Sequence, residues 1–289
     1  MTKQNDELTI RRILVALDAS HHSLAALDAA AELAASLEAE VQGLFVEDVN
    51  LLRAARSPAA REVQYPIATT ARLDRARMER ALRAQATQAR RALAACCERR
   101  QVKYSFRVVR GKVAPEVLAA AMEADLLSLG KASLPLGGRV WRVRLGSTAR
   151  AAAAQAPRSV LLIQRGVGLS PPVMVVYDGS SIAQRALTMA ARLAQKTGEY
   201  LAVLMIASAS DDLPGLKSEA ADLLRGRRLV VHYRTLANAD AATIAQQLPT
   251  EGKGVLVLSI PLVQPDALDA LLDQVECPVL LIRGQTSSL

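Results

Sequence analysis

Short apolar runs alternate with longer stretches of helical spacing along this chain. The runs are rich in Val, Ile and Leu, as is typical of strands buried on both faces of a sheet. Strands are expected at 13–17, 41–46, 104–109, 125–129 and 159–163. Helices are expected at 20–37, 70–100, 115–124 and 147–155. Because strands that alternate with helices pair in parallel through right-handed crossovers, the pattern predicts an α/β fold.

The same order of elements occurs twice. Residues 13–46 align with residues 173–206 without a gap, and 10 of the 34 aligned pairs are identical. Both copies also end on the same four residues, VLLI, at 160–163 and 279–282. In the second copy, strands are expected at 173–177, 201–206, 229–233, 255–258 and 278–282.

The repeat predicts two domains, at 1–166 and 172–289, with a linker at 167–171 that contains Gly and Pro. Charge is divided unevenly between them. Up to Gly166 the chain has 26 Lys and Arg against 16 Asp and Glu, a net charge of +10, whereas the rest has 10 against 12, a net charge of −2. The total of +8 therefore belongs to the first domain, which points to an anionic partner.

In an open parallel sheet, ligands bind beyond the carboxyl ends of the strands, where the strand order reverses. The turns after the first and fourth strands of the first copy meet this condition. They contain glycines, which let backbone N–H groups approach an anion, and a helix start, which adds free N–H groups and a favourable dipole. Lys131, Arg139, Arg142 and Arg144 add positive charge. The pattern favours a phosphate cradle without a Walker GxxxxGK[ST] motif, and the alternative is an ordinary flexible loop with a helix cap.

The first copy contains LVALDAS at 14–20, ADLLSLG at 124–130, LGST at 145–148 and APRSVLLI at 156–163. These motifs, in this order and with counterparts in the second copy, resemble the universal stress protein family. The resemblance implies two tandem Rossmann-like domains, each with a five-stranded parallel sheet of order 3-2-1-4-5 and helices on both faces. It also implies antiparallel pairing of the two last strands, within this chain as a pseudo-dimer, with a further homodimer left open.

Family members that bind ATP carry Gly-x-x-Gly, nine residues and then Gly-Ser/Thr after the fourth strand. Here Gly130 fits the first glycine, Ser133 replaces the second, and Gly146 follows three residues late. The resemblance therefore implies a stress-response regulator that binds ATP in the first domain, with Mg only as the ion of the nucleotide. It also implies that the backbone of Val46 meets the adenine. The predicted binding residues are Asp18, Ala19, Ser20, Val46, Gly130, Lys131, Gly146, Ser147 and Thr148.

The second copy keeps Asp178, Gly179 and Ser180 in its first turn but reads SIPLVQP at 259–265 after its fourth strand. Proline has no N–H group to donate, and no glycine lies between Val255 and Cys277. The phosphate cradle is missing, so we predict a partner domain without a nucleotide site.

Residues 70–100 contain nine arginines and three acids. This run supports a second hypothesis, a scaffold without a nucleotide that recognises an acidic protein partner through the first domain. A nucleic-acid partner is disfavoured because aromatic residues, which stack on bases, make up only 3% of the chain. The simpler interpretation of the run is a solvated helix face. The connection at 50–69, absent from the second copy, is expected to be a lid or a packed surface loop.

Several classes of protein are disfavoured by what the sequence lacks. No apolar run reaches the ~18–20 residues of a membrane helix, and the polar start and three cysteines favour a cytoplasmic location. His21, His22 and His232 give no metal-ligand cluster and no Ser–His–acid constellation, so no metal ligand or catalytic residue is predicted. An enzyme that cleaves ATP therefore ranks last. The cysteines are expected to be packing residues.

Overall fold

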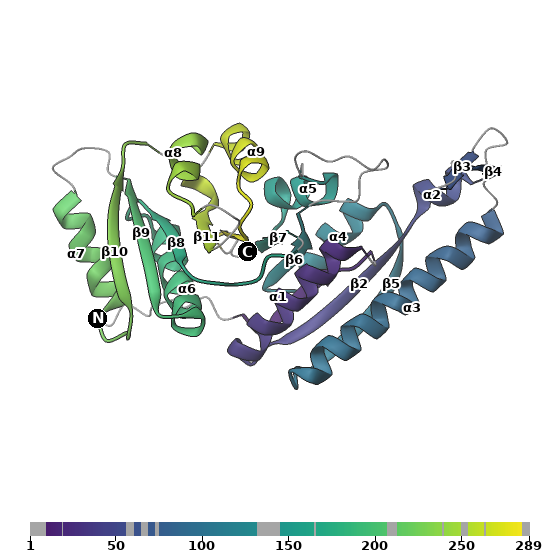
Figure 1. The fold of residues 1–289 in the computed structure, drawn as a ribbon, viewed down its shortest axis with the longest axis horizontal. Coiled ribbons are helices and arrows are strands. Elements are labelled where there is room, and N and C mark those ends of the chain that lie inside the picture. Colours follow the sequence, from purple (N-terminus) through teal and green to yellow (C-terminus); the bar gives the residue numbers. More distant parts are fainter. Residues whose placement is uncertain are drawn as a thin grey trace, which may run out of the picture.

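The computed structural model describes residues 10–18, 20–55, 61–64, 69–72, 75–131, 145–164, 166–206, 213–238, 240–249, 254–262 and 264–284. These residues form an elongated α/β molecule on one ten-stranded sheet (Figure 1). The first half of the sheet contains β1 (Arg12–Ala16), β2 (Glu40–Asp48), β5 (Tyr104–Gly111), β6 (Leu126–Gly130) and β7 (Ser159–Ile163). The second half contains β8 (Val173–Tyr177), β9 (Tyr200–Ile206), β10 (Val230–Leu236), β11 (Val255–Ser259) and β12 (Val279–Ile282).

Both halves have the same topology. The strand orders are β5-β2-β1-β6-β7 and β10-β9-β8-β11-β12, and every pair within a half is parallel. The halves join through β7 and β12, which pair antiparallel with Leu161 opposite Leu280. The predicted α/β class, the order 3-2-1-4-5 in each copy and the antiparallel pairing of the last strands are confirmed. The exact domain boundaries stay a prediction.

Helices cover both faces of the sheet. One face carries α1 (His21–Leu37), α3 (Arg75–Arg99), α6 (Ser181–Thr197) and α7 (Leu213–Leu224). The other carries α4 (Val113–Ala121), α5 (Ser147–Gln155), α8 (Ala241–Gln246) and α9 (Pro265–Gln274). Alanine lines the buried sides of α1 and α6, which lets these helices lie close to the strands. Ser20 and Ser180 cap them by accepting the N–H groups of Ser23 and Ala183.

The connection after β2 holds structure that the sequence pattern did not predict. It contains α2 (Val49–Ala54) and a hairpin of β3 (Arg61–Gln64) and β4 (Thr69–Arg72). The expected helix at 70–100 therefore begins only at Arg75, because the β-branched pair Thr69 and Thr70 belongs to β4. Figure 1 shows the hairpin at the outer end of the molecule, away from α5.

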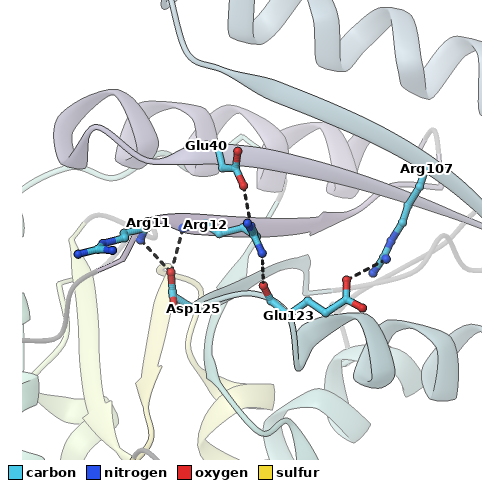
Figure 2. A network of polar contacts seen from close by, with 6 residues as sticks. All are labelled: Arg11, Arg12, Glu40, Arg107, Glu123 and Asp125. Carbon is cyan, nitrogen blue, oxygen red and sulfur yellow. Dashed lines mark hydrogen bonds and ion pairs between the residues drawn. The ribbon is translucent and has the colours of Figure 1, made fainter.

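A polar network ties the strands together at the amino end of the first half of the sheet (Figure 2). Asp125 accepts the backbone N–H groups of Arg11 and Arg12 at 2.9 and 3.0 Å. The Arg12 side chain pairs with Glu40 at 2.6 Å and donates to the carbonyl of Glu123 at 2.9 Å. The charged side chains of Arg12, Glu40 and Asp125 therefore pair with one another or with backbone groups. In the described part of the chain, no helix is long and apolar enough to cross a membrane.

Candidate functional site

A cavity lies at the opposite, carboxyl edge, where β1, β2 and β6 end beside the first turns of α4 and α5. Six of the predicted binding residues line it: Asp18, Ser20, Val46, Gly130, Gly146 and Thr148. The other walls are mainly apolar and include Leu44, Val113 and Leu129. The cavity measures about 100 Å³. Small-molecule sites commonly measure ~300–1,000 Å³, so the described residues enclose room for part of a larger ligand.

The turn after β1 holds Asp18 in a fixed position. Asp18 Oδ1 accepts the N–H group of Ser20 at 2.9 Å, and the backbone N–H group of Asp18 donates to Ser23 Oγ at 3.4 Å. Ser20 Oγ is used as the cap of α1, so its hydroxyl has a structural role. Asp18 itself is exposed at the mouth of the turn, where its carboxylate can accept a further hydrogen bond. Ala19 lies outside the described residues.

Gly130 is required by close packing at the end of β6. A Cβ atom at this position would lie 2.8 Å from the carbonyl carbon of His22 and 2.8 Å from its Cβ atom. Real Cβ atoms do not approach other atoms so closely, so only glycine lets the first turn of α1 lie against β6. His22 is therefore a packing neighbour of the site through its backbone.

The backbone of Val46 faces the same cavity. Along β2, Glu40 donates its N–H group to the carbonyl of Arg11, so every second residue from Glu40 onward turns its backbone toward β1. The bond from the N–H group of Leu17 to the carbonyl of Leu44, at 2.8 Å, lies at the end of β1. On the side of β1, the described part of the sheet has no strand opposite Val46, because β1 ends at Ala16 opposite Leu44. Its N–H and carbonyl groups are therefore placed to bind a ligand.

The start of α5 supplies donors from the other side. Gly146 is the N-cap residue and makes no side-chain cap, and its own N–H group donates to the carbonyl of Lys131 at 2.9 Å. The next N–H groups, of Ser147, Thr148 and Ala149, have no acceptor within the helix. Thr148 and Ala149 line the cavity, whereas the Ser147 side chain is exposed. These N–H groups and the helix dipole favour an anion at this position.

Lys131 does not face the cavity, although it follows Gly130 directly. Its side chain is 1% exposed and its ammonium group donates to the carbonyl of Val275, which follows α9 in the second half. Burial lowers the pKa of Lys131 to about 8, against the opposing effects of Cys277 and Asp273. The residue thus links the two halves of the molecule. The predicted Ser133, Arg139, Arg142 and Arg144 lie outside the described residues.

Two residues of α9 hold the start of α5 and were not found from the sequence. Asp273 accepts the N–H group of Leu145 at 2.9 Å and lies 3.5 Å from Arg150, which also pairs with Asp269. Nothing in the local sequence signals these contacts, because they depend on the pairing of β7 with β12. Both described ends of the 132–144 segment, Lys131 and Leu145, are therefore bonded to the second half.

The equivalent place in the second half is built differently. Ser259 takes the position of Gly130 and is followed by a 3-10 turn, Ile260–Leu262. Helix α9 begins at Pro265, which has no N–H group, and carries Asp266 in its first turn. A missing donor and a negative charge both disfavour an anion.

Other candidate chemistry is not assembled in the described residues. They contain no group of three His, Cys, Asp or Glu side chains that could hold a metal ion. Cys96, Cys97 and Cys277 are buried, and burial raises the pKa of each thiol to about 11. Such thiols stay protonated at neutral pH, as expected of packing residues.

The comparisons with known proteins agree with this architecture. The model of the universal stress protein family matches residues 9–164, more than half of the chain. The chain belongs to the universal stress protein family. No curated protein matches it.

Solved structures extend the likeness to the second half. A universal stress protein from Archaeoglobus fulgidus matches 94% of this chain and 98% of its own length, with 16% identity and a TM-score of 0.71. A functionally unknown protein from Pseudomonas aeruginosa matches 98% of this chain and 95% of its own, with 13% identity and a TM-score of 0.63. At these identities the likeness shows a shared two-part fold.

Proposed function

We propose that this universal stress protein binds an adenine nucleotide such as ATP at the cavity of its first half, and that it acts as a stress-response regulator. One observation carries the proposal. The open backbone of Val46 and the uncapped start of α5 face a single cavity in a chain of this family. The first can recognise a base and the second can hold phosphates.

The groups around the cavity suit different parts of a nucleotide. The apolar side chains of Leu44, Val113 and Leu129 can pack against a base whose edge bonds to the backbone of Val46. The carboxylate of Asp18 can accept a hydrogen bond from a ribose hydroxyl. The N–H groups at the start of α5 bind phosphate oxygens. Lys131 is left out of the proposed site because its ammonium group is used in the second half.

The proposed activity is binding. The carboxylates of Asp273 and Asp269 near the start of α5 are already engaged by the N–H group of Leu145 and by Arg150, and any magnesium ion would arrive with the nucleotide. The second half is proposed to carry no nucleotide, because Pro265 and Asp266 stand where the first half has free N–H groups. Its role would be to fix the end of β6 and the start of α5 through Lys131 and Asp273.

Matched variants in the two halves test this proposal. Asp18 and Asp178 are equivalent residues, and each accepts the N–H group of the serine two positions later, at 2.9 and 3.0 Å. We expect Asp18→Ala and Asp178→Ala to lower the melting temperature by similar amounts. Only Asp18→Ala should weaken ATP binding, measured by isothermal titration and by the thermal shift that bound ligand produces.

Gly146→Val probes the phosphate end of the site. Gly146 lines the cavity at the start of α5, so a bulkier residue is expected to obstruct the phosphates, and we expect the ATP-dependent thermal shift to disappear. The proposal is wrong if the full chain shows no shift with ATP or ADP. It is also wrong if Asp178→Ala lowers the affinity as much as Asp18→Ala.

A further inference from the structure

The outer edge of the first half of the sheet is an open strand. Strand β5 pairs only with β2 in the described part of the chain, and the carbonyl of Lys103 accepts the N–H group of Val41. Since backbone groups alternate along a strand, those of every second residue from Tyr104 to Arg110 face away from β2. Val108 on this edge is 43% exposed and Tyr104 is 38% exposed. An open edge with exposed apolar residues is a template for another strand.

Helix α3 places positive charge beside this edge. It contains seven arginines and two glutamates, and it packs against β2 and β5 with Leu82 and Leu93 buried (Figure 1). The Arg90 guanidinium lies 5.1 Å from the ring centre of Phe106 on β5. Arg83 lies on the same side of the helix, two turns earlier. A chain added to β5 would therefore run past Arg83 and Arg90.

Several arginines of α3 form no ion pair with an acidic side chain in the described part of the chain. Among the described residues, Arg80, Arg83 and Arg91 are exposed and form no ion pair. Glu79 is paired with Arg75 at 3.0 Å. The hydrogen bond from Arg75 lowers the pKa of Glu79, and the more distant charges of Arg110 and Arg83 lower it further.

Other arginines of the first half are already neutralised. Arg107, on the opposite face of β5, pairs with Glu123 at 3.0 Å, and Arg12 pairs with Glu40 (Figure 2). Arg110 pairs with Glu47 at 2.6 Å. Among the described elements of this half, α3 thus carries seven arginines against two glutamates, next to the open edge.

The charge decides which partner fits. Pairing of β5 with β5 of a second copy would bring two arginine-rich α3 helices together, and like charges would oppose it. Stacking of nucleic-acid bases is disfavoured as well, because aromatic residues make up only 3% of the chain. A peptide strand instead satisfies the open backbone groups and can carry carboxylates.

We propose that β5 and α3 form a docking site for an acidic segment of a partner protein, which adds to β5 as a further strand with its carboxylates toward Arg83 and Arg90. Backbone bonds to β5 would supply affinity in this mode, and alternate side chains would supply specificity. The site is on the outer edge of β5 and does not depend on nucleotide binding at the cavity.

The test uses a short fluorescent peptide of alternating Glu and Thr. Its control is a peptide of the same composition in which all Glu residues precede all Thr residues, so that charge is kept and alternation is lost. We expect the alternating peptide to bind the full chain at least ten times more tightly than the control, measured by fluorescence anisotropy. Hydrogen exchange should show new protection in the segment that contains Phe106 and Val108.

Two variants test the edge and two test the charge. Val108→Pro removes an N–H group that faces away from β2, so the ladder with β2 stays intact, and Thr235→Pro does the same on β10 at the other end of the sheet. Arg90→Glu reverses a charge beside Phe106, and Lys217→Glu does so at α7, where Lys217 lies 5.3 Å from the ring centre of Tyr233.

We expect the Val108 and Arg90 variants to bind the alternating peptide at least ten times more weakly and the Thr235 and Lys217 variants to bind it normally. Equal binding of the two peptides, or normal binding by Val108→Pro, would overturn strand addition. Tighter binding of a single-stranded oligonucleotide than of the alternating peptide would also overturn the proposal. Circular dichroism of each variant confirms that it is folded.

Discussion

Replacing Lys131 with Met would reveal a buried charge that links the two halves of the molecule. The ammonium group of Lys131 lies between β6 and the end of α9, and it donates to the carbonyl of Val275. Methionine has a similar length and keeps the packing, but it carries no charge. The variant therefore removes the titration of this group while leaving the surrounding fold in place.

The size of the effect follows from the pKa of the lysine. Burial lowers it from 10.5 to about 8, and each pKa unit corresponds to ~1.4 kcal/mol, so the buried charge costs the folded state ~3 kcal/mol at neutral pH. Below pH 8 both the folded and the unfolded chain hold the proton, and the full cost is present. Between pH 8 and 10.5 only the unfolded chain holds it. The unfolding free energy therefore rises with pH in this range.

Urea unfolding followed by circular dichroism measures the difference. The unfolding free energy of the unchanged protein minus that of Lys131→Met should be constant below pH 7.5 and should rise by ~3 kcal/mol toward pH 10.5. The buried thiols also titrate in alkaline solution, but both proteins contain them, so their contribution largely cancels. Repeating the comparison with Cys277→Ala in both proteins removes the nearest thiol. A difference that stays flat with pH, or falls, would refute this reasoning.

Two further substitutions test packing and the contact between the halves. Gly130→Ala would place a Cβ atom 2.8 Å from the His22 backbone. It should lower the unfolding free energy, measured by urea unfolding, by ~1–3 kcal/mol. Gly168 has open space around it, so the control Gly168→Ala should change the unfolding free energy little. Asp273→Ala leaves the N–H group of Leu145 without its acceptor and should lower the same quantity by ~1–3 kcal/mol. Asp269→Ala removes only a partly exposed ion pair and should cost less than ~1 kcal/mol, so an equal loss in both variants would contradict the role given to Asp273.

The sequence was sufficient to predict the fold because local patterns agree with the tertiary structure. Strands buried on both faces leave continuous apolar runs in the sequence, as in VLLI at both 160–163 and 279–282. Because these patterns occur twice, the elements predicted in one half support those predicted in the other. The serine caps of α1 and α6 are also local, so Ser20 could be identified directly. The start of α3 was placed too early, because its arginine-rich pattern continues smoothly into β4.

The candidate site was predictable only in part. Asp18, Gly130 and Gly146 come together because the carboxyl ends of parallel strands meet at one edge, a rule that needs no knowledge of side chains. The direction of Lys131 could not be predicted, since it depends on where the second half packs against β7. For the same reason, no local motif signals Asp273 as the acceptor for Leu145.

The two halves differ most where a helix follows the fourth strand. In the first half, glycine at the end of β6 lets α1 approach, and α5 begins with N–H groups that have no acceptor. In the second half, Ser259 stands at the strand end and α9 begins with Pro265. The same helix α9 supplies Asp273 to the start of α5. The half whose own helix start lacks these donors thus fixes the helix start that has them. Under the proposed function, loss of one site and support of the other would be properties of a single helix.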